Sequence, residues 1–398
     1  MPPLFISCGL CIFATTNNMK NITLKSKINA DEYTEYVCES FDIMNRNQSE
    51  VVIPFNFKKL QSIEWNIGAI IGGSGSGKTS ILKTFGQIQQ PQFDNSKALI
   101  SNFDWLSPKE ATMLLTSMGL SSVPCWLRPF NTLSNGEQYR ATMAYITASA
   151  KSGDVILIDE FTSVVDRDVA KSMSYALQKY IRLHNLKIII ASCHYDILEW
   201  LMPNWVCNPQ KGGVLEECDY LRRGRPQIQL SVSRVTSQTW DIFKSHHYMT
   251  SSVNKSCTFL LFEWNEKPIA IVAVIATPRN NNPNGKAISR VVVLPDYQGI
   301  GIGSKICNFI GGIYRNANCD LYIKTVNPAL GEYFNKSTNW IPTAHNGKMR
   351  KNRNEKHYAN RLERQSYCHK YAGEKIVEYA DLLLSIDAMR TKAQLKLF

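Results

Sequence analysis

The sequence lacks any long, uninterrupted apolar segment. Beyond its first eighteen residues it contains no run of eighteen apolar residues, so we expect no transmembrane span. Its cysteines are eleven, an odd number, and they lack the paired spacings of zinc sites or of a disulfide framework. The one C-x-x-C, Cys8 to Cys11, has no second half. This use of cysteine indicates a reducing compartment, and we expect a cytoplasmic protein.

The start of the chain lacks the features of a signal peptide. Residues 1–18 hold an apolar run of about a dozen residues, which is too short to cross a bilayer, and no basic segment precedes it. We expect Met19 to be the true start, with a genuine buried strand as the alternative. Residues 1–35 are interpreted as an N-terminal extension.

Acidic residues are in short supply. Lys and Arg number 45 against 33 Asp and Glu, a formal net charge of +12. Such an excess favours a polyanionic partner such as nucleic acid, although it also serves solubility. Half of it falls in the last stretch, where residues 345–398 hold twelve Lys or Arg and six Asp or Glu. Residues 346–398 are therefore expected to form a basic tail that suits phosphate contacts. A length of 398 residues suits two domains.

The segment WNIGAIIGGSGSGKTSILKTFG predicts a strand, a glycine loop and a helix, with the pattern G-x-x-x-x-G-K-[ST]. Glycines let backbone N–H groups surround phosphates, Lys78 reaches the outer phosphates, and the Thr79 hydroxyl binds Mg²⁺. Further on, DVILIDEF predicts a buried strand that ends in two carboxylates. Asp159 is expected to hold Mg²⁺, and Glu160 to orient and deprotonate an attacking water.

Three further segments accompany these motifs: LSNGEQ (residues 133–138), SVVD (163–166) and IIIASCH (188–194). With them, residues 36–217 resemble the ABC ATPase superfamily. LSNGEQ resembles its signature, SVVD resembles its D-loop, and His194 resembles its switch histidine. The resemblance implies that His194 senses the γ-phosphate; an ordinary core histidine is the alternative. It also implies a head-to-tail homodimer in which Ser134 and Gly136 of one copy close on the ATP held by the other. The implied ATP-binding set is Gly72, Ser74, Gly75, Gly77, Lys78, Thr79, Ser80, Asp159, Ser134, Gly136 and Asp166.

Two departures from this family bear on function. Only 56 positions separate Lys78 from Ser134, fewer than a transporter ATPase usually has there, and the glutamine that couples to membrane domains has no secure counterpart. A transport role is therefore disfavoured, and a soluble ABC protein that acts on nucleic acid fits better. Phe41 is the candidate for stacking on adenine; a plain core phenylalanine is the alternative.

Residues 218–225 have the charge and helix breakers of a linker, and a different order follows. A strand, a helix and three strands lead into VVLPDYQGIGIGS, a glycine turn that lacks the Lys and Thr of a triphosphate site. Residues 226–345 thereby resemble the GNAT acetyltransferase superfamily, with Gln298, Gly301 and Gly303 in its Q-x-x-G-x-G loop. A dinucleotide-binding loop is the rival, but it needs an acidic residue where this chain has Thr325 and Val326. The implied acetyl-CoA-binding set is Val291, Val293, Gln298, Gly299, Gly301, Ile302, Gly303 and Ser304.

The resemblance also implies how acyl transfer is catalysed. Backbone N–H groups around Val291 to Val293 polarise the thioester carbonyl, and a tyrosine protonates the leaving thiolate. The family's tyrosine position holds Phe334 here, and Tyr333 is the substitute candidate, with a surface role as the alternative. FKSHHYMT resembles the phage Mom-type DNA-modifying relatives of this superfamily, in which His247 and Tyr248 would contact the acceptor base; a partly buried capping pair is the alternative.

The expected fold class is therefore α/β, with a P-loop ABC ATPase domain followed by a mixed α/β GNAT domain. The expected ligands are ATP, Mg²⁺ and acetyl-CoA. The favoured function is an ATP-hydrolysing ABC ATPase coupled to an acetyl-CoA-dependent N-acyltransferase that acts on nucleic acid. The alternatives are an ATP-gated nucleic-acid clamp whose second domain only senses acetyl-CoA and, third, a transporter ATPase subunit with a regulatory domain.

Overall fold

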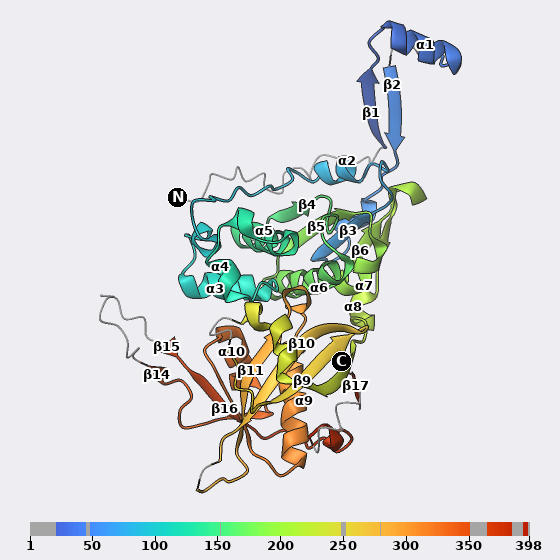
Figure 1. The fold of residues 1–398 in the computed structure, drawn as a ribbon. Coiled ribbons are helices and arrows are strands. Elements are labelled where there is room, and N and C mark those ends of the chain that lie inside the picture. The colour runs from blue at the N-terminus through green and yellow to red at the C-terminus, as the bar shows by residue number, and fades with distance from the viewer. Residues whose placement is uncertain are drawn as a thin grey trace. The chain divides into compact units, whose positions relative to one another are not determined.

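The computed structural model describes residues 21–44, 48–151, 153–247, 252–278, 280–350, 364–383 and 393–396 (Figure 1). The chain forms two compact units, each made of two separate stretches of sequence. The first unit comprises residues 1–92 and 145–225, and the second comprises residues 93–144 and 226–398.

A five-stranded sheet organises the first unit, in the order β4-β5-β3-β6-β7. Strands β3 (Ile67–Ile71), β4 (Val155–Ile158), β5 (Lys187–Ser192) and β6 (Trp205–Cys207) are parallel, and β7 (Leu215–Glu217) pairs antiparallel with β6. All five residues of β3 are buried, as a central strand covered on both faces requires. The carboxyl ends of β3, β4 and β5 therefore lie at one edge of this sheet.

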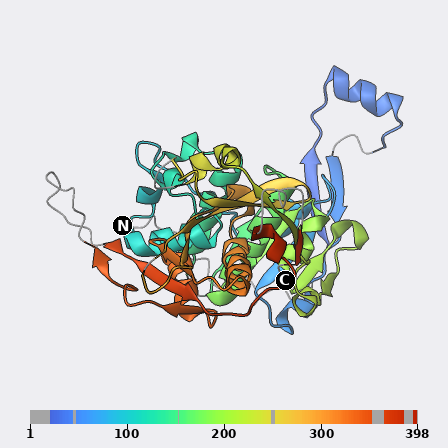
Figure 2. The ribbon, with the colours of Figure 1, turned by 60° about the horizontal axis from the view of Figure 1, so that its bottom comes forward.

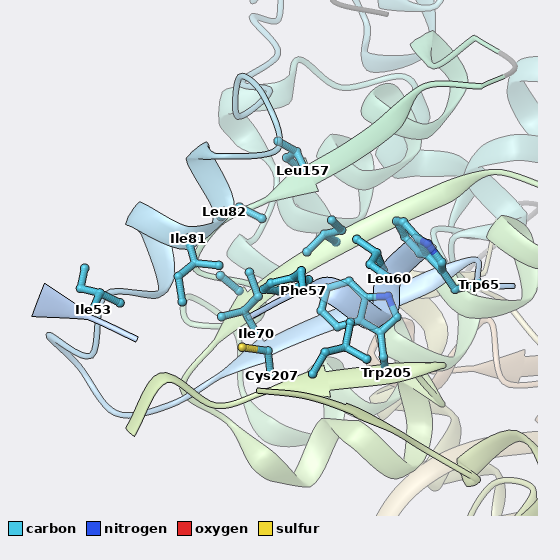
Figure 3. Close-up of a cluster of buried hydrophobic side chains, with 13 residues drawn as sticks. Ile53, Phe57, Leu60, Trp65, Ile70, Ile81, Leu82, Leu157, Trp205 and Cys207 are labelled. Atoms are coloured by element: carbon cyan, nitrogen blue, oxygen red, sulfur yellow. The ribbon is translucent and has the colours of Figure 1, made fainter. Parts of the chain in front are cut away.

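Helices cover this sheet and connect its strands. They are α2 (Lys78–Lys83), α6 (Arg167–Leu183), α7 (Leu198–Leu201), α8 (Tyr220–Arg223) and the part of α5 that begins at Tyr145. In α6 the buried apolar residues recur at intervals of three and four, from Val169 to Ile181, which gives the helix one apolar stripe. The core beneath α2 joins Ile53, Ile81, Leu157 and Trp205 (Figure 3).

An arm precedes this sheet. Strands β1 (Ile22–Lys27) and β2 (Gln48–Ile53) pair antiparallel, and α1 (Glu32–Ser40) lies between them in sequence and at the end of the arm (Figures 1 and 2). Asp31 and Thr34 form a capping box at the start of α1. Because α1 runs through residue 35, the expected boundary between extension and ATPase falls inside a helix.

The second unit begins with the helices of residues 93–144. They are α3 (Pro108–Ser117), α4 (Val123–Trp126) and the first turns of α5 (Asn135–Ser149). Ser107 and Glu110 cap α3 reciprocally, and Pro108 takes its first position. These helices belong to the same compact unit as residues 226–398.

An eight-stranded sheet organises the rest of the second unit, in the order β13-β16-β12-β11-β10-β9-β8-β17. Strands β8 (Gln229–Val235), β9 (Thr258–Trp264), β10 (Lys267–Ala276) and β11 (Lys286–Val293) form an antiparallel meander. Helix α9 (Ile302–Asn316) then connects β11 to the parallel strand β12 (Leu321–Thr325), and α10 (Pro328–Lys336) follows. The described pairing of β11 with β12 ends at Ile288 and Ile323, although β11 continues to Val293.

The segment expected as a separate basic tail contributes to this sheet. Strand β16 (Tyr367–Tyr371) lies between β12 and β13 (Trp340–Pro342), and β17 (Ala393–Lys396) pairs with β8. A short pair, β14 (Met349–Arg350) and β15 (Arg364–Gln365), precedes β16. Alternating Tyr367, His369 and Tyr371 are buried, so the basic composition of the segment conceals a strand.

The expected helix at residues 236–248 is instead two 3₁₀ segments, Ser237–Ile242 and Lys244–His246. Trp240 and Phe243, three residues apart, both enter the core cluster of the antiparallel strands. A spacing of three aligns side chains in a 3₁₀ helix, so burial of this pair accounts for the tighter form.

No helix among the described residues is long and apolar enough to cross a membrane. Every cysteine within the described part of the chain is free, from Cys38 to Cys368.

Candidate functional sites

The first glycine loop connects β3 to α2. Gly75 has φ +75° and Gly77 has φ +89°, a left-handed conformation that glycine adopts without strain. Gly77 is also the N-cap residue of α2, where the first helical hydrogen bond joins Ile81 N to Gly77 O at 3.0 Å. The N–H groups of Lys78, Thr79 and Ser80 precede that bond and are left for another acceptor.

The side chains around this loop fit a phosphate group. Lys78 is buried and its Nζ donates to Gly73 O at 2.7 Å, which holds the ammonium across the loop. The Ser76 Oγ is buried with no hydrogen-bond partner, an arrangement that a polar ligand would satisfy. Ser74 and Gly75 lie exposed at the tip of the loop. The residues present therefore suit a nucleotide triphosphate.

Strand β4 ends at the two predicted carboxylates. The Asp159 Oδ1 accepts a hydrogen bond from Glu160 N at 3.0 Å, and the side chain of Glu160 is exposed. Glu160 has φ +49° and Thr162 has φ +67°, both rare for residues with a side chain. These two conformations strain the backbone at the end of a core strand. Functional sites often retain strain of this kind.

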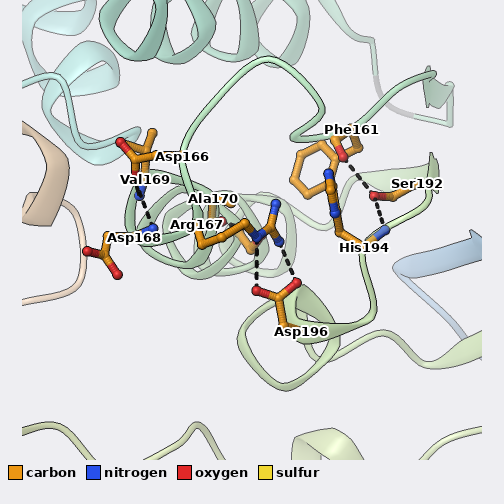
Figure 4. A network of polar contacts seen from close by, with 10 residues as sticks. Phe161, Asp166, Arg167, Asp168, Val169, Ala170, Ser192, His194 and Asp196 are labelled. Atoms are coloured by element: carbon orange, nitrogen blue, oxygen red, sulfur yellow. Dashed lines mark hydrogen bonds and ion pairs between the residues drawn. The ribbon is translucent and has the colours of Figure 1, made fainter.

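Ser192 connects the ends of β3, β4 and β5. Its Oγ donates to Phe161 O at 2.8 Å and accepts from His194 N at 3.1 Å (Figure 4). Its carbonyl accepts from Gly72 N at 3.3 Å, at the entrance to the glycine loop. One buried serine thus fixes the backbone of the predicted switch histidine relative to the glycine loop and the acidic strand end.

The predicted D-loop leads into α6. Asp166 is the N-cap residue, and its Oδ1 accepts from Asp168 N at 2.9 Å and Val169 N at 3.1 Å (Figure 4). The next residue, Arg167, forms an ion pair with Asp196, with Nε to Oδ2 at 3.0 Å. Burial would raise the pKa of Asp196, but the hydrogen bond and charge of Arg167 lower it below its ordinary value.

The signature segment lies in the second unit and starts α5. Ser134 N donates to Glu137 Oε2 at 2.9 Å, and Glu137 N donates to Ser134 Oγ at 3.3 Å, which is a capping box. Burial would raise the pKa of Glu137, but the Cys125 thiol and Ser134 lower it by hydrogen bonding. Because the Ser134 hydroxyl accepts here, its proton stays available to an anion. Ser134 is exposed and Gly136 is half-buried, which suits a site completed by another molecule.

The structure does not bring Phe41 to the glycine loop. Phe41 is the C-cap residue of α1, 73% exposed, at the end of the arm. The residue expected to stack on adenine thus lies on the arm.

The second glycine loop repeats the geometry of the first. Gly299 has φ +85° and Gly301 has φ +82°, again two positions apart, and Gly301 is the N-cap residue of α9. The first helical bond joins Lys305 N to Gly301 O at 3.4 Å, so the N–H groups of Ile302, Gly303 and Ser304 precede it. A Cβ on Gly303 would meet only Val293 Cγ2, at 3.6 Å, so there is open space beside it. These features fit a diphosphate.

Beside this loop, the edge of β11 is separated from β12. The register of β11 against β10 shifts between Ala273 and Val274, where Ser289 is the extra residue. A bulge of this kind bends a strand. Val291 and Val293, both half-buried, lie beyond the last β11–β12 pair and remain paired with β10. The backbone N–H groups that are predicted to polarise the thioester carbonyl would therefore act at the edge of β11 that faces away from β10.

The two aromatic residues of α10 differ in their surroundings. Phe334 is fully buried and packs on Trp340 and His369, with ring centroids 4.7 Å and 5.7 Å away. Tyr333 is half-buried, and its Oη accepts a hydrogen bond from Asn308 Nδ2 at 2.8 Å. Tyr333 is thus held toward α9, the helix that follows the glycine loop, and keeps its own proton to donate.

The predicted acceptor contacts are described only in part. His247 is half-buried, with its ring 5.7 Å from that of Trp240, and Tyr248 lies outside the described residues. Residues 351–363, which hold four of the twelve Lys and Arg counted in residues 345–398, lie outside them as well.

Several residues at these sites carry no sequence signal. Gln210 Oε1 accepts from Gly73 N at 2.9 Å at the first loop, although 137 positions separate them. Asn308, in α9, donates a hydrogen bond to Tyr333, but a polar residue in that helix does not stand out in the sequence. Only the fold brings them to the sites, so spacing in the sequence does not reveal them.

The comparisons with known proteins concern both parts of the chain. Residues 215–335 match the model of the acetyltransferase (GNAT) family. No curated protein matches the chain. Similar solved structures include the dimeric ATP-binding cassette MJ0796 bound to ADP and Pi, at 16% identity and TM-score 0.35, covering 50% of this chain and 97% of that one.

Two acetyltransferase structures are also similar. The ribosomal-protein-S18-alanine N-acetyltransferase from Escherichia coli has 12% identity and a TM-score of 0.29, covering 38% of this chain and 97% of that one. A GNAT family acetyltransferase from Elizabethkingia anophelis with acetyl-CoA bound has 16% identity and a TM-score of 0.25, covering 36% and 97%. These three TM-scores are below 0.5, so the sites rest on the motifs and geometry of this chain.

The fold and the sites define a mixed α/β protein that combines a P-loop nucleotide unit with an acyl-CoA-type glycine loop. More particularly, residues 215–335 match the acetyltransferase (GNAT) family. The first part resembles an ABC ATPase in its motifs, because its glycine loop, acidic strand end and predicted switch histidine follow three adjacent parallel strands at one sheet edge. The mixed α/β fold class is confirmed, and the GNAT resemblance predicted from the second glycine loop agrees with the family match.

Proposed function

We propose that this protein hydrolyses ATP and transfers an acyl group from acetyl-CoA to an amino group on nucleic acid. The observation that carries the proposal is the pair of glycine loops. Each has two left-handed glycines two positions apart, Gly75 and Gly77 in one and Gly299 and Gly301 in the other, and each starts a helix. Only the first adds a lysine and a threonine, so the two loops suit different phosphates.

In the ATPase half, the loop amides and Lys78 bind the phosphates, and Thr79 and Asp159 hold Mg²⁺. Glu160, exposed on its strained backbone, accepts a proton from the attacking water. His194, held by Ser192, contacts the γ-phosphate. Ser134 and Gly136 of a second copy complete the site, which makes the active form a head-to-tail homodimer.

In the second half, the N–H groups of residues 299–304 bind the diphosphate of acetyl-CoA. The bound cofactor supplies an activated thioester. The edge of β11 that faces away from β10, at Val291 and Val293, would orient the thioester carbonyl, and the Tyr333 hydroxyl would donate a proton to the departing sulfur.

Charge supports nucleic acid as the acceptor. The chain has a net charge of +12, and the resemblance around His247 and Tyr248 is to enzymes that modify DNA. A stacked base must be exposed before its amino group can react, and unstacking costs a few kcal/mol. A nucleotide-driven clamp would supply that energy.

The test is transfer of label from acetyl-CoA. The full-length protein is incubated with labelled acetyl-CoA, Mg-ATP, and DNA or RNA, and the polymer is digested to nucleosides. We expect label in a modified nucleoside, with less label when Gly301→Ala strains the loop. Label that stays on acetyl-CoA in every reaction would refute the transferase activity.

One observation favours a second candidate, an ATP-gated clamp that only senses acetyl-CoA. Phe334 occupies the family's tyrosine position and is fully buried, so the usual proton donor is missing there. Tight binding of acetyl-CoA without transfer to any polymer would select this candidate.

A further inference from the structure

The predicted acetyl-CoA loop is held by residues from the ABC-like half of the sequence. Residues 93–144, which include the signature, belong to the same compact unit as the GNAT strands. Two contacts in this unit meet the backbone and side chain of the loop itself.

Arg140 makes the first contact. It lies in α5, is 1% exposed, and donates from Nη2 to Asp296 O at 3.1 Å. Its Nη1 lies 3.5 Å from both Gln298 O and Met118 O. A planar guanidinium thereby holds two carbonyls directly before Gly299, and charged donors of this kind make the stronger hydrogen bonds.

Gln298 makes the second contact. Its Oε1 accepts from Ser121 N at 2.8 Å, and its Nε2 donates to Val293 O at 2.8 Å. The first residue of the Q-x-x-G-x-G motif therefore joins the end of β11 to the segment between α3 and α4. The side chain is used in this bridge, so its amide groups act on the protein and not on the diphosphate.

The packing around Arg140 leaves no room for adjustment. Gly119 has φ +82°, and a Cβ there would lie 2.1 Å from Arg140 Nη1 and 3.0 Å from Gln298 O. Gly119 therefore packs directly against both the guanidinium and the loop carbonyl. Ser134, whose capping box starts α5, is six residues before Arg140, about 9 Å along the helix axis.

We propose that Arg140 is a positioning residue for the acetyl-CoA loop and couples that loop to the nucleotide state. When Ser134 and Gly136 close on the ATP of a second copy, α5 carries the displacement to Arg140, and the carbonyls of Asp296 and Gln298 follow. The orientation of the N–H groups after Gly299 then changes, and with it the affinity for acetyl-CoA. This rests on the proposed function, and linkage requires acetyl-CoA to change the affinity for ATP by the same factor.

The test measures acetyl-CoA binding by calorimetry on the full-length Glu160→Gln protein, with and without Mg-ATP. Light scattering reports the dimer in the same samples. We expect the dissociation constant to differ at least fivefold between the two states, as is typical of coupled sites. With Arg140→Met added, which keeps the length and removes the donors, we expect the ratio to fall below twofold.

Two further variants separate positioning from folding. Arg140→Lys keeps the charge but cannot hold both carbonyls, so an intermediate ratio is expected. Lys109→Met, on the exposed face of α3, removes a cation from the same unit and should keep the full ratio. If Arg140→Met does not fold, the ratio of dissociation constants is measured on Arg140→Lys and Gly119→Ala instead.

The outcomes are distinguishable. Equal affinity in both nucleotide states, or an undiminished ratio in the Arg140 variants, overturns the coupling and leaves the proposed function intact. Failure of Glu160→Gln to dimerise with ATP removes the driving step and also overturns it. No acetyl-CoA binding in any state refutes the transferase function itself.

Discussion

Substitution of Gly77 by alanine tests whether the first glycine loop has the conformation described. The residue has φ +89°, and an added Cβ would lie 2.6 to 2.9 Å from three side-chain atoms of Ile53, which is 4% exposed. The left-handed conformation costs about 1–2 kcal/mol for a residue with a Cβ. Overpacking a buried site costs roughly 1–3 kcal/mol. Gly77→Ala should therefore destabilise the first unit by about 2–5 kcal/mol, a fall in melting temperature of roughly 4–20 °C.

Gly75→Ala is the matched control. Gly75 has φ +75°, but nothing lies within 4 Å of its added Cβ, so only the conformational cost of about 1–2 kcal/mol applies. The assay is calorimetric melting of the full-length protein without nucleotide, reading the transition that an ATP analogue raises. Ile53→Ala should cost less in the Gly77→Ala background than alone, because it removes the overlap. A Gly77→Ala loss no larger than that of Gly75→Ala would refute the loop geometry.

Four other predictions follow from the sites. Glu160→Gln should trap an ATP-bound dimer and slow turnover by at least about a hundredfold; an unchanged turnover rate would remove Glu160 as the base. Tyr333→Phe should lower kcat for acyl transfer by about a hundredfold and leave the KM for acetyl-CoA unchanged, whereas a normal kcat would exclude Tyr333 as proton donor. The lowered pKa of Asp196 adds stability above its ordinary value of 3.8, and this stability is lost as pH falls through the lower folded pKa. With both partners more than a third exposed, Asp196→Asn should cost only about 0.5–1 kcal/mol at pH 7, and the cost in urea unfolding should shrink as pH falls below 3.8. DNA affinity, measured by fluorescence anisotropy, should fall about a thousandfold between 50 and 200 mM salt if six phosphates are contacted, and a flat response would contradict a phosphate-binding role for the basic charge.

The sequence predicts those features whose physics is local. A loop that needs a left-handed backbone needs glycine there, so its position can be recognised in the sequence. Gly75, Gly77, Gly299 and Gly301 all have positive φ where the loops require it. Apolar runs bounded by turns located β3, β4 and β5, because central parallel strands are buried on both faces. The order of the motifs then places their chemistry at one sheet edge.

Features that depend on tertiary packing leave no such pattern. No motif in the sequence marks Arg140, yet it is buried against the loop before Gly299. Phe41 reads as a stacking or core residue, yet it is 73% exposed. Tyr367 and His369 stand among basic residues, and their alternation as a strand is visible only once β12 and β13 flank them.

The grouping of residues 93–144 with residues 226–398 changes what counts as the acetyltransferase part of this chain. A cut at residue 225 keeps every GNAT strand but removes Arg140 and Ser121, the donors to the loop carbonyls and to the Gln298 side chain. Without these donors, the loop carbonyls and the Gln298 side chain would lose the contacts that fix their positions. The segment that carries the predicted ABC signature therefore supports the predicted acetyl-CoA loop. Under the proposed coupling, a movement of Ser134 on ATP binding would reach that loop through the single helix α5.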